Sequence, residues 1–490
     1  MKYFVTLLFF ILHSSSLIAQ DTSCGLVWGQ IIQLSHDSTT NNNLPEMAAQ
    51  GDTIHVTWRD GQNAYKLPYS RSTNGGASFE PTRSLLTGTI FGSPPFQKIV
   101  ANKNTVFLFF CSATNWTTPI YLMRSSDAGS TWSYPTPITT DSVTQLLYAS
   151  ILGDTVGIIH RENYNSLNWK LTLSTDNGDT WINPRSSVLT TGGEKVAIGS
   201  KNLHRLYTLG ETYYRKSSDL GNTWSDSIQL STEDVYASLE SNLGVATYAN
   251  SDRIFTAWRD GKYGGGFASS VLLRYSADEG NSWSDEYWVN ETPDGNLGYG
   301  SVATENKTTA FVWSKSITPS NTRIQLRYSL DSGNRWSSIC TPSDILPMQN
   351  QGSPVCAVSP SGFHVVWERR TETGGWGVFY RRGALITQVP DNEQTLPDGI
   401  LLEQNYPNPF NPQTAIGFSL LAVSNVTLSV YDIFGKEVET LIHSRLMDEG
   451  RHTVEWNAEG FASGLYFYRL TAIDEKNKKS VLTKRMILMK

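Results

Sequence analysis

An eight-residue pattern, Ser-x-Asp-x-Gly-x-Thr-Trp, recurs six times along the 490-residue chain and constrains its fold more than any other feature. The copies are centred on Asn74, Asp127, Asp176, Asp219, Asp278 and Asp331, with Phe79 replacing Trp in the first and Arg335 replacing Thr in the last. An Asp or Asn side chain accepts hydrogen bonds from nearby backbone, Gly adopts the positive φ of a tight turn, and Trp supplies a large apolar face. Each copy therefore predicts a turn between strands, in one repeated supersecondary unit.

Four strands are expected in each repeat. Around the first copy they lie near 44–49, 53–58 and 65–72 and after Phe79, which is the build of a propeller blade. First strands begin near Pro45, Pro95, Tyr148, Lys195, Leu243, Tyr299 and Pro354. The seventh repeat, 352–383, lacks the motif, and the N-terminal segment 26–34 is expected to supply its outer strand and close the ring. Over residues 24–387 this gives roughly 52 residues per blade, against roughly 61 for six blades, so seven blades are favoured and six stay possible.

The composition agrees with an all-β fold. Apolar residues make up 39% of the chain and charged residues 17%, which supplies a core and excludes a disordered chain. The 39 Gly and 56 aromatic residues (15 Trp, 22 Tyr, 19 Phe) indicate many short strands and turns. A net charge of −6 argues against a nucleic-acid partner, and no later stretch of about 18 apolar residues predicts a membrane-spanning helix.

The first 20 residues have a basic start, an apolar run and small residues near Ala19, which predicts a secretory signal peptide over 1–20. The mature chain keeps Cys24, Cys111, Cys340 and Cys356, and an oxidising compartment would allow one or two disulfides. Four cysteines can pair in three ways, and the sequence does not choose among them. Metal-ligand spacing of the Cys-x-x-Cys kind is absent, so no metal and no cofactor is expected.

A second domain follows a polar, proline-bearing linker at 388–402. Residues 403–490 open with three prolines in Tyr-Pro-Asn-Pro-Phe-Asn-Pro and continue as alternating strands, which predicts a small Ig-like β-sandwich.

The six motif copies resemble the Asp-box, or BNR repeat, of sialidase-like β-propellers. In that group the Asp-boxes are structural turns of enzymes and non-enzymes alike, so the resemblance implies the fold and a capping role for Asp127 and its counterparts. The resemblance to sialidase enzymes would imply a ring of six blades, and a ring of seven blades would differ from those enzymes.

Four ordered motifs of the second domain, NYPNPFNP, VYDIFGKEV, GLYFYRL and the ending KRMILMK, resemble the type A C-terminal sorting domain of the type IX secretion system. The resemblance implies export across the outer membrane of a Bacteroidetes-like bacterium, through the type IX machinery, to the medium or the cell surface. The basic residues Lys484, Arg485 and Lys490 would then be part of the export signal.

Candidate ligand-binding residues gather at the ends of the second strands. Antiparallel order places the motifs on one face of the ring and these ends on the opposite face, where propeller loops commonly bind ligands. The candidates are Arg59, Asp60, Arg161, Glu162, Arg259, Asp260, Tyr263, Tyr299, Glu368 and Arg369. Arginine pairs bidentately with carboxylates, so Arg59, Arg259 and Arg369 could hold an acidic sugar, as the arginine triad does in sialidases. The alternative is that these charges form salt bridges between blades and a solvated rim.

Sialidase chemistry would further require a tyrosine nucleophile, a glutamate beside it and an aspartic acid. Tyr164, Tyr236, Tyr263 or Tyr299, with Glu162, Glu240 or Glu305 and with Asp60, are available, but no motif selects among them. The Arg-Ile-Pro segment that precedes the first Asp-box in sialidases is missing. Trp116, Trp169, Tyr263, Tyr299 and Trp376 are expected in or near loops, where flat rings could stack on sugars.

The sequence thus predicts a secreted or cell-surface propeller that recognises extracellular glycans or other polymers, with the catalytic residues unknown. Two alternatives stay open: an exo-sialidase-like glycoside hydrolase that uses the arginine cluster, and a non-catalytic adhesin or scaffold.

Overall fold

The computed structural model describes residues 24–35, 41–61, 66–86, 96–111, 119–139, 145–161, 169–187, 195–232, 241–247, 253–264, 268–290, 297–318, 321–343, 350–372, 374–385, 400–402, 405, 407–420, 422–432, 435–474 and 479–489. The chain divides into two compact units, Met1–Ile386 and Thr387–Lys490. Every regular element in the described ranges is a β-strand, which confirms the all-β prediction. The predicted signal peptide lies outside the described residues.

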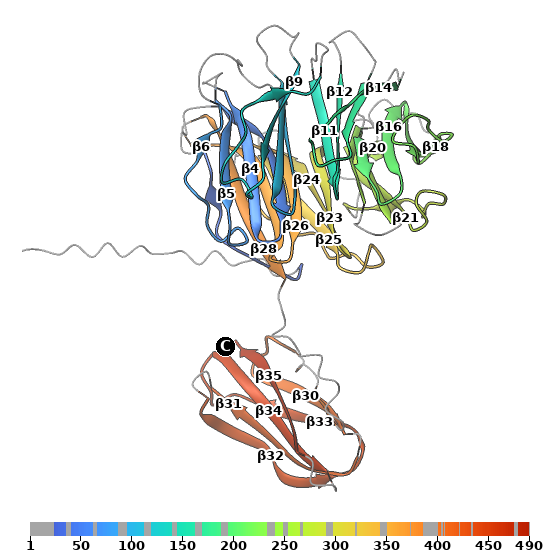
Figure 1. Ribbon diagram of the computed structural model, residues 1–490. Helices are drawn as coiled ribbons and strands as arrows, with labels where there is room; N and C mark the ends of the chain where they lie inside the picture. The colour runs from blue at the N-terminus through green and yellow to red at the C-terminus, as the bar shows by residue number, and fades with distance from the viewer. Residues whose placement is uncertain are drawn as a thin grey trace, which may run out of the picture. The chain divides into compact units, whose positions relative to one another are not determined.

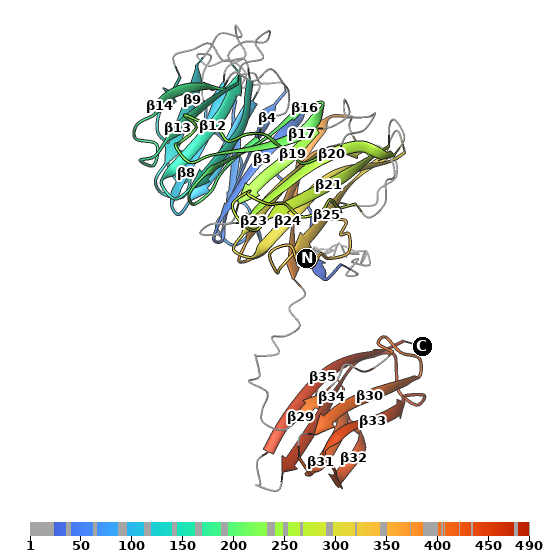
Figure 2. The same ribbon diagram turned by 90° about the vertical axis from the view of Figure 1, so that its right-hand side faces the viewer.

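The described part of the first unit forms seven antiparallel sheets, here numbered by chain order (Figures 1 and 2). Sheet 1 contains β3 (Asn42–Gln50), β4 (Thr53–Asp60), β5 (Pro68–Ser72) and β6 (Arg83–Ser84). Sheet 2 contains β7 (Phe96–Asn102), β8 (Thr105–Cys111), β9 (Ile120–Ser125) and β10 (Thr136–Pro137). Sheet 3 contains β11 (Gln145–Leu152), β12 (Thr155–Arg161), β13 (Trp169–Ser174) and β14 (Ile182–Ser187). Sheet 4 contains β15 (Lys195–Ile198), β16 (Leu203–Leu209), β17 (Glu211–Ser217) and β18 (Ile228–Gln229).

The remaining sheets of this unit follow the same order. Sheet 5 contains β19 (Ser241–Thr247), β20 (Ile254–Gly264), β21 (Ala268–Ser276) and β22 (Tyr287–Trp288). Sheet 6 contains β23 (Leu297–Glu305), β24 (Thr308–Thr318) and β25 (Asn321–Ser329). Sheet 7 contains β26 (Gln351–Ser359), β27 (Gly362–Arg370) and β28 (Trp376–Leu385), joined by β1 (Leu26–Trp28) and β2 (Ile32–Gln33).

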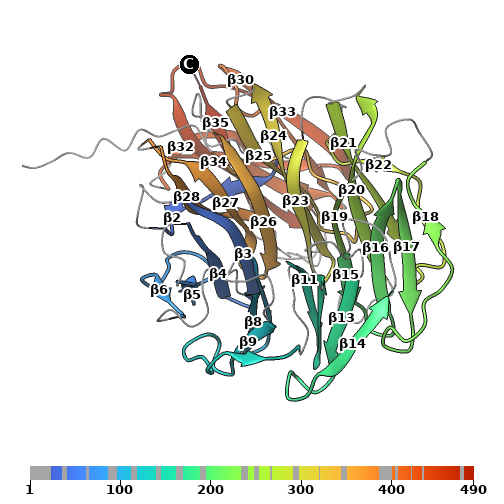
Figure 3. The same ribbon diagram turned by 90° about the horizontal axis from the view of Figure 1, so that it is seen from above.

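The sheets form a closed cycle. Each first strand contacts the first strand of the next sheet, in the order β3, β7, β11, β15, β19, β23 and β26, and β26 contacts β3 again. These strands lie innermost and the last strands outermost when the unit is viewed from above (Figure 3). Apolar clusters fill the spaces between neighbouring sheets, for example Trp58 and Val56 of sheet 1 against Val366 and Val378 of sheet 7. The first unit is therefore a β-propeller, and we interpret each sheet as one blade.

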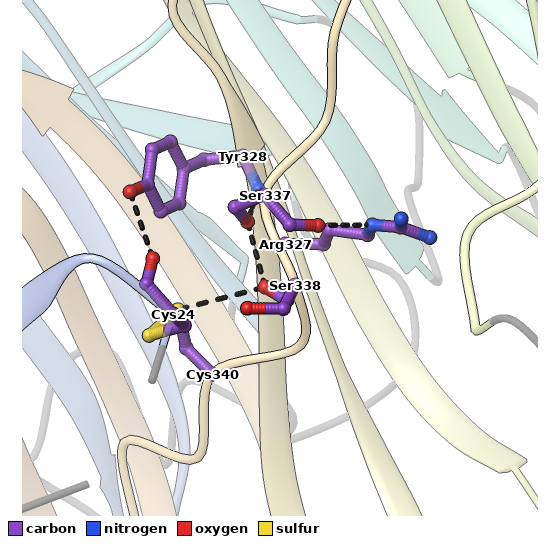
Figure 4. The surroundings of a disulfide bond; sticks show 6 residues. All are labelled: Cys24, Arg327, Tyr328, Ser337, Ser338 and Cys340. Carbon is purple, nitrogen blue, oxygen red and sulfur yellow. Dashed lines mark hydrogen bonds between the residues drawn. A yellow bond between two sulfur atoms is a disulfide. The ribbon is translucent and has the colours of Figure 1, made fainter. Parts of the chain in front are cut away.

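The N-terminal segment completes sheet 7, as the sequence predicts. Leu26 pairs with Leu385, and Ile32 pairs with Tyr380, both on β28. A disulfide between Cys24 and Cys340 fixes this segment to the residues that follow β25, and the Tyr328 hydroxyl donates to the Cys24 carbonyl at 2.9 Å (Figure 4). Cys111 and Cys356 are buried thiols. The structure thus selects one of the cysteine pairings that the sequence left open.

Each motif turn is closed by one set of hydrogen bonds. The Asp127 carboxylate accepts from the backbone N–H of Thr131 at 2.9 Å and from its hydroxyl at 2.7 Å, while Ser125 accepts from the Gly129 N–H at 2.8 Å. The same backbone bond to the side chain recurs at Asn74, Asp176, Asp219, Asp278 and Asp331. At Asp219, hydrogen bonds from the Thr223 backbone and hydroxyl lower the carboxyl pKa to about 2. These side chains therefore act within their own turns.

The motif also joins neighbouring sheets. A Cβ at Gly129 would lie 2.1 Å from the Tyr69 hydroxyl of the preceding sheet, and φ of Gly129 is +81°. The motif Trp132 packs edge-on against the same Tyr69 ring, with centroids 5.3 Å apart. The sequence alone assigns this aromatic residue only a large apolar face. The structure shows that it contacts the sheet before it, so each motif helps to hold two sheets together.

A buried histidine supports the tyrosine beneath three of these turns. The hydrogen-bonded pairs are His55 with Tyr69 (2.8 Å), His204 with Tyr214 (2.8 Å) and His364 with Tyr380 (2.7 Å). Burial, followed by the charge of Lys216, lowers the pKa of His204 to about 4. At the same register positions sheet 2 carries Phe107 with Leu122 and sheet 5 carries Phe255 with Leu273. A Cβ at the next motif glycine, Gly178 or Gly333, would then meet the phenylalanine ring.

The two faces of the propeller follow from strand register. Gln50 pairs with Thr53 beside the turn that joins β3 to β4, and the first motif turn bonds to that turn through the Gly75 N–H and the Asp52 carbonyl at 2.8 Å. We call this end the motif face. Asn42 pairs with Asp60 at the other end, which we call the loop face.

The second unit is a two-sheet sandwich. One sheet contains β29 (Ile400–Leu402), β30 (Gln413–Leu420) and β33 (Gly450–Asn457). The other contains β31 (Ser424–Tyr431), β32 (Glu437–Met447), β34 (Gly464–Asp474) and β35 (Lys479–Leu488). Both sheets pack on one core that includes Trp456, Phe418 and Tyr468. The sandwich prediction is confirmed, although Ile400–Leu402, which the sequence analysis placed in the linker, pairs with β30.

The first and last motifs of this domain meet. The backbone N–H of Phe410, in the proline-rich entry, donates to Ile487 at 3.0 Å, and the Met489 N–H donates back to Phe410 at 2.9 Å. The Phe410 ring packs against Trp456 with centroids 5.4 Å apart. The entry segment therefore holds the end of β35 in place.

Candidate functional site

Arg59, Arg161 and Arg259 occupy equivalent positions at the loop face, and Arg369 stands one residue further along its strand. Arg59 pairs with Asn43, Arg161 with Gln145, Arg259 with Ser241 and Arg369 with Gln351, each at or next to the start of a first strand. Lys315 of sheet 6 pairs with Leu297 and, like Arg369, stands one residue beyond the position of Arg59, at the position of Asp60. Five sheets thus carry a cation near the loop-face end of the second strand, at two successive positions.

The side chains of these arginines contact neighbouring protein groups. Arg259 donates to the Leu297 carbonyl at the start of the next sheet, at 2.8 Å. Arg161 lies over the Trp169 ring at 5.5 Å from its centroid, and Arg369 over the Phe379 ring at 3.8 Å, each within its own sheet. Arg59 is half-buried. None of the four lines the described cavity of the channel, so the structure does not bring them together around it.

The other predicted site residues are dispersed. Asp60 is half-buried at the end of β4, whereas Asp260 is fully buried and accepts from the Trp258 indole at 3.4 Å. The backbones of Tyr263 and Tyr299 belong to β20 and β23. Trp116, Glu162, Tyr164, Tyr236 and Glu240 lie outside the described residues. Glu305 lies at the motif-face end of β23, and burial raises its pKa.

Two aromatic residues expected in or near loops are the first residues of strands. Trp169 begins β13 and is buried in an apolar cluster with Ile159 and Leu171, and Trp376 begins β28 and is half-buried. Trp169 therefore offers no free face to a sugar.

A cavity of about 460 Å³ occupies the loop-face half of the channel. Its walls are the first strands of six sheets, namely β3, β7, β11, β15, β23 and β26, with Glu368 of β27. A second cavity of about 240 Å³ follows toward the motif face, and the two share Tyr148, Val100 and Cys356. The larger volume falls in the range of small-molecule sites.

One level of the larger cavity collects side chains from equivalent strand positions. Glu46 pairs with Thr57, Lys98 with Phe109, Tyr148 with Ile159, Lys195 with Leu206 and Ser301 with Val312. Each of these partners stands two residues before the position that corresponds to Arg59. We call this set the channel ring: Glu46, Lys98, Tyr148, Lys195 and Ser301.

Register shifts in the first strands separate the channel ring from the residues at the loop-face ends of those strands. They occur between Asn43 and Glu46 in β3, and at equivalent places in β11, β19, β23 and β26. Such bulges change the direction in which side chains point, and they are common beside binding sites. Glu368 holds two of them, since it accepts from the Leu44 N–H and from the Ser353 hydroxyl, both at 2.9 Å.

The charges of the channel ring are partly matched. Lys98 and Glu46 form an ion pair between sheets 2 and 1. The ammonium of Lys195 lies 5.0 Å from the centroid of the Tyr148 ring in the preceding sheet. Burial, and then repulsion from Lys98, lowers the pKa of Lys195 to about 8, and attraction to Glu46 opposes this shift. Burial also raises the pKa of Tyr148, and it raises that of the Cys356 thiol to about 12.

Sequence reasoning missed the channel ring because it searched the strand ends. The available signal was a charged residue inside an apolar first strand, as in Phe-Gln-Lys98-Ile-Val and Pro-Glu46-Met-Ala. Within the described ranges no group of three or more His, Cys, Asp or Glu side chains is placed to hold a metal ion. No helix in those ranges is long and apolar enough to cross a membrane.

Comparisons with solved structures support the propeller fold. An ulvan lyase of polysaccharide lyase family PL25, bound to -[GlcA(1-4)Rha3S]-, matches with a TM-score of 0.51 at 11% identity over 71% of this chain and 95% of that one. A fungal alcohol oxidase of the AA5 family, in complex with copper, matches with a TM-score of 0.50 at 10% identity over 95% and 100%. A Trypanosoma rangeli sialidase matches at 0.44 and 10% identity over 93% and 88%. These likenesses concern the fold alone.

A search of curated proteins finds no match to this chain. Residues 404–488 match the family described as the secretion system C-terminal sorting domain. This match confirms the assignment made from the four sequence motifs, and it indicates secretion or attachment to the cell surface. The chain therefore combines a β-propeller with a C-terminal sorting domain of the type IX secretion system.

Proposed function

We propose that this is an exported propeller that binds extracellular glycans or related polymers at its loop face, with the 460 Å³ cavity as the central site. A signal peptide at 1–20 would start export, the sorting domain would complete it, and the six motif turns would be structural Asp-boxes. The observation that carries the proposal is the channel ring, where charged groups and a tyrosine ring converge in a concave site. We call the predicted residues at the loop-face ends of the second strands, which include Arg59, Arg259 and Arg369, the rim. They would contact the parts of a polymer that extend beyond the cavity.

Two features favour a polysaccharide among possible polymers. Lysine, glutamate and tyrosine side chains offer hydrogen bonds and a flat apolar face, which together suit a pyranose ring. A solved propeller of the same fold is described as bound to a polysaccharide fragment that contains glucuronic acid. Acidic polysaccharides are therefore the first probes to use.

The test is affinity electrophoresis of the full chain in gels that contain alginate, polygalacturonate, carrageenan or laminarin. In parallel, the chain is incubated with these polymers and with a fluorogenic sialoside, and any release of products is measured. The double variant Glu46→Gln/Lys98→Met removes the ion pair of the channel ring without changing net charge. We expect it to weaken retention by the best polymer at least about tenfold. The matched control is Arg124→Met/Asp179→Asn, which removes an inter-sheet ion pair near the motif face.

Each outcome has a definite meaning. Retention that survives the channel variant but is lost in Arg259→Ala would move the site to the rim. Release of a fluorogenic sialoside, abolished by Arg259→Ala, would support the hydrolase alternative. Retention by no polymer would contradict the proposal and leave the scaffold alternative.

A further inference from the structure

We propose that Lys195 is the anchor for an acidic sugar, so that the ligand of the channel carries a carboxylate or sulfate group. The inference rests on the proposed function and names the ligand class for the same cavity. It begins with the position of Lys195 on β15, where the side chain lines the cavity and lies against the Tyr148 ring.

The charge balance around the cavity singles out Lys195. The carboxylate of Glu46 is paired with Lys98, and the carboxylate of Glu368 accepts two hydrogen bonds from the bulges of β3 and β26. Among the described residues, Lys195 has a ring contact but no ion pair. A half-buried ammonium without a counter-ion is costly, and an anionic ligand would supply the missing charge.

The surroundings of Lys195 favour an anion over a second cation. Lys98 adds positive charge nearby, and it is the charge whose repulsion lowers the Lys195 pKa. A carboxylate or sulfate ester entering from the loop face would meet both ammonium groups, although Lys98 stays shared with Glu46. The volume of about 460 Å³ accommodates a sugar unit in addition to its charged group.

The ionisation of Lys195 gives a second expectation. The titratable groups that line the same cavity are Lys98, Glu46, Tyr148, Cys356 and Glu368. Tyr148 and Cys356 stay protonated at pH 8, because burial raises the pKa of both groups. Loss of the Lys195 proton above pH 8 should therefore weaken the binding of an anion.

The experiment is calorimetric titration of the full chain at pH 7 with D-glucuronate, D-glucose 6-sulfate and D-glucose. We expect at least one anionic sugar to bind about tenfold more tightly than glucose, since one charged contact is worth about that much. Glucuronate and glucose 6-sulfate distinguish a carboxylate site from a sulfate site. Raising the pH from 7 to 9 should reduce the preference for the anionic sugar.

The variants separate a ligand contact from a structural role. Lys195→Met should remove the preference for the anionic sugar, while Lys195→Arg should keep most of it because the charge is retained. The matched control is Lys201→Met, which changes an exposed lysine in the turn at the other end of the same sheet. Thermal unfolding of each variant checks that it folds.

The proposal is overturned if Lys195→Met keeps the preference, if Lys201→Met loses it equally, or if glucose and the anionic sugars bind alike. The experiments distinguish a wrong role for Lys195 from a wrong proposed function. If neutral polysaccharides such as laminarin bind through Glu46 and Lys98 while no anionic preference exists, the glycan site stands and the anchor role falls. If no polymer binds at all, the proposed function itself is contradicted.

Discussion

The motif glycines serve two purposes at the residue scale. Gly129 adopts φ of +81° and also lies directly beneath the Tyr69 hydroxyl, whereas Gly51 adopts φ of +56° with no atom near its missing Cβ. The sequence predicted the conformational purpose from turn chemistry. It could not predict the close approach, because Tyr69 belongs to the preceding sheet.

This difference yields a prediction. Gly129→Ala should lower the free energy of unfolding by more than about 2 kcal/mol, since it combines backbone strain with a clash against a buried ring. Gly51→Ala should cost only about 1 kcal/mol from backbone strain. Urea denaturation of both variants measures the contrast, and equal losses would show that the Tyr69 contact has no energetic weight.

At the element scale, the sheets use two interchangeable ways to support the next motif turn. Sheets 1, 4 and 7 use a buried His–Tyr pair, as at His204 and Tyr214, and sheets 2 and 5 use Phe with Leu, as at Phe107 and Leu122. This exchange could not be predicted without the strand register, because the two positions lie 10 to 18 residues apart on different strands.

Replacing a His–Tyr pair by Phe and Leu should change how the stability of the propeller depends on pH. The pKa of His204 is lowered in the folded chain from 6.5 to about 4, so its stabilising neutral form is complete above pH 6.5 and its contribution is lost as the pH falls toward 4. One such group can remove up to about 3 kcal/mol over this window. The double variant His204→Phe/Tyr214→Leu should therefore lose less stability between pH 6.5 and 4 than the natural chain.

Denaturant unfolding at several pH values measures this dependence. His55 and His364 remain in the variant and should preserve part of the slope, because burial lowers the pKa of both. If the free energy of unfolding fell equally steeply with pH in the variant and in the natural chain, His204 would not contribute to the pH dependence.

At the scale of the whole molecule, repeats were the most predictable feature. Six motif copies and the strand pattern around them predicted the propeller and its closure by residues 26–34, and the alternating strands of 403–490 predicted the sandwich. The channel ring was not predictable, because bulges in the first strands decide which side chains face the axis. Arg59, Arg161 and Arg259 lie at equivalent positions of three sheets and Arg369 lies one residue further along, and the contacts of these arginines with Leu297, Trp169 and Phe379 depend on neighbouring strands and sheets.

The disulfide supports the closure of the ring. Cys24 and Cys340 are 316 residues apart in sequence, so their bond restricts a very long loop of the unfolded chain. The variant Cys24→Ser/Cys340→Ser should be less stable by about 2–4 kcal/mol. Denaturant unfolding with and without reductant tests this, and the natural chain should approach the variant when reduced. A natural chain that is equally stable in reductant would contradict the expectation.

The pairing of β1 with β28 also sets the order in which the molecule can be completed. A chain that emerges from a translocation pore N-terminus first delivers Leu26 long before Leu385, its partner. Until β28 arrives, β1 and β2 lack their strand partner and expose unpaired backbone edges that could join other chains. Completion of the propeller therefore coincides with the arrival of the segment that leads into the sorting domain, so only a nearly finished chain can present a closed propeller for export.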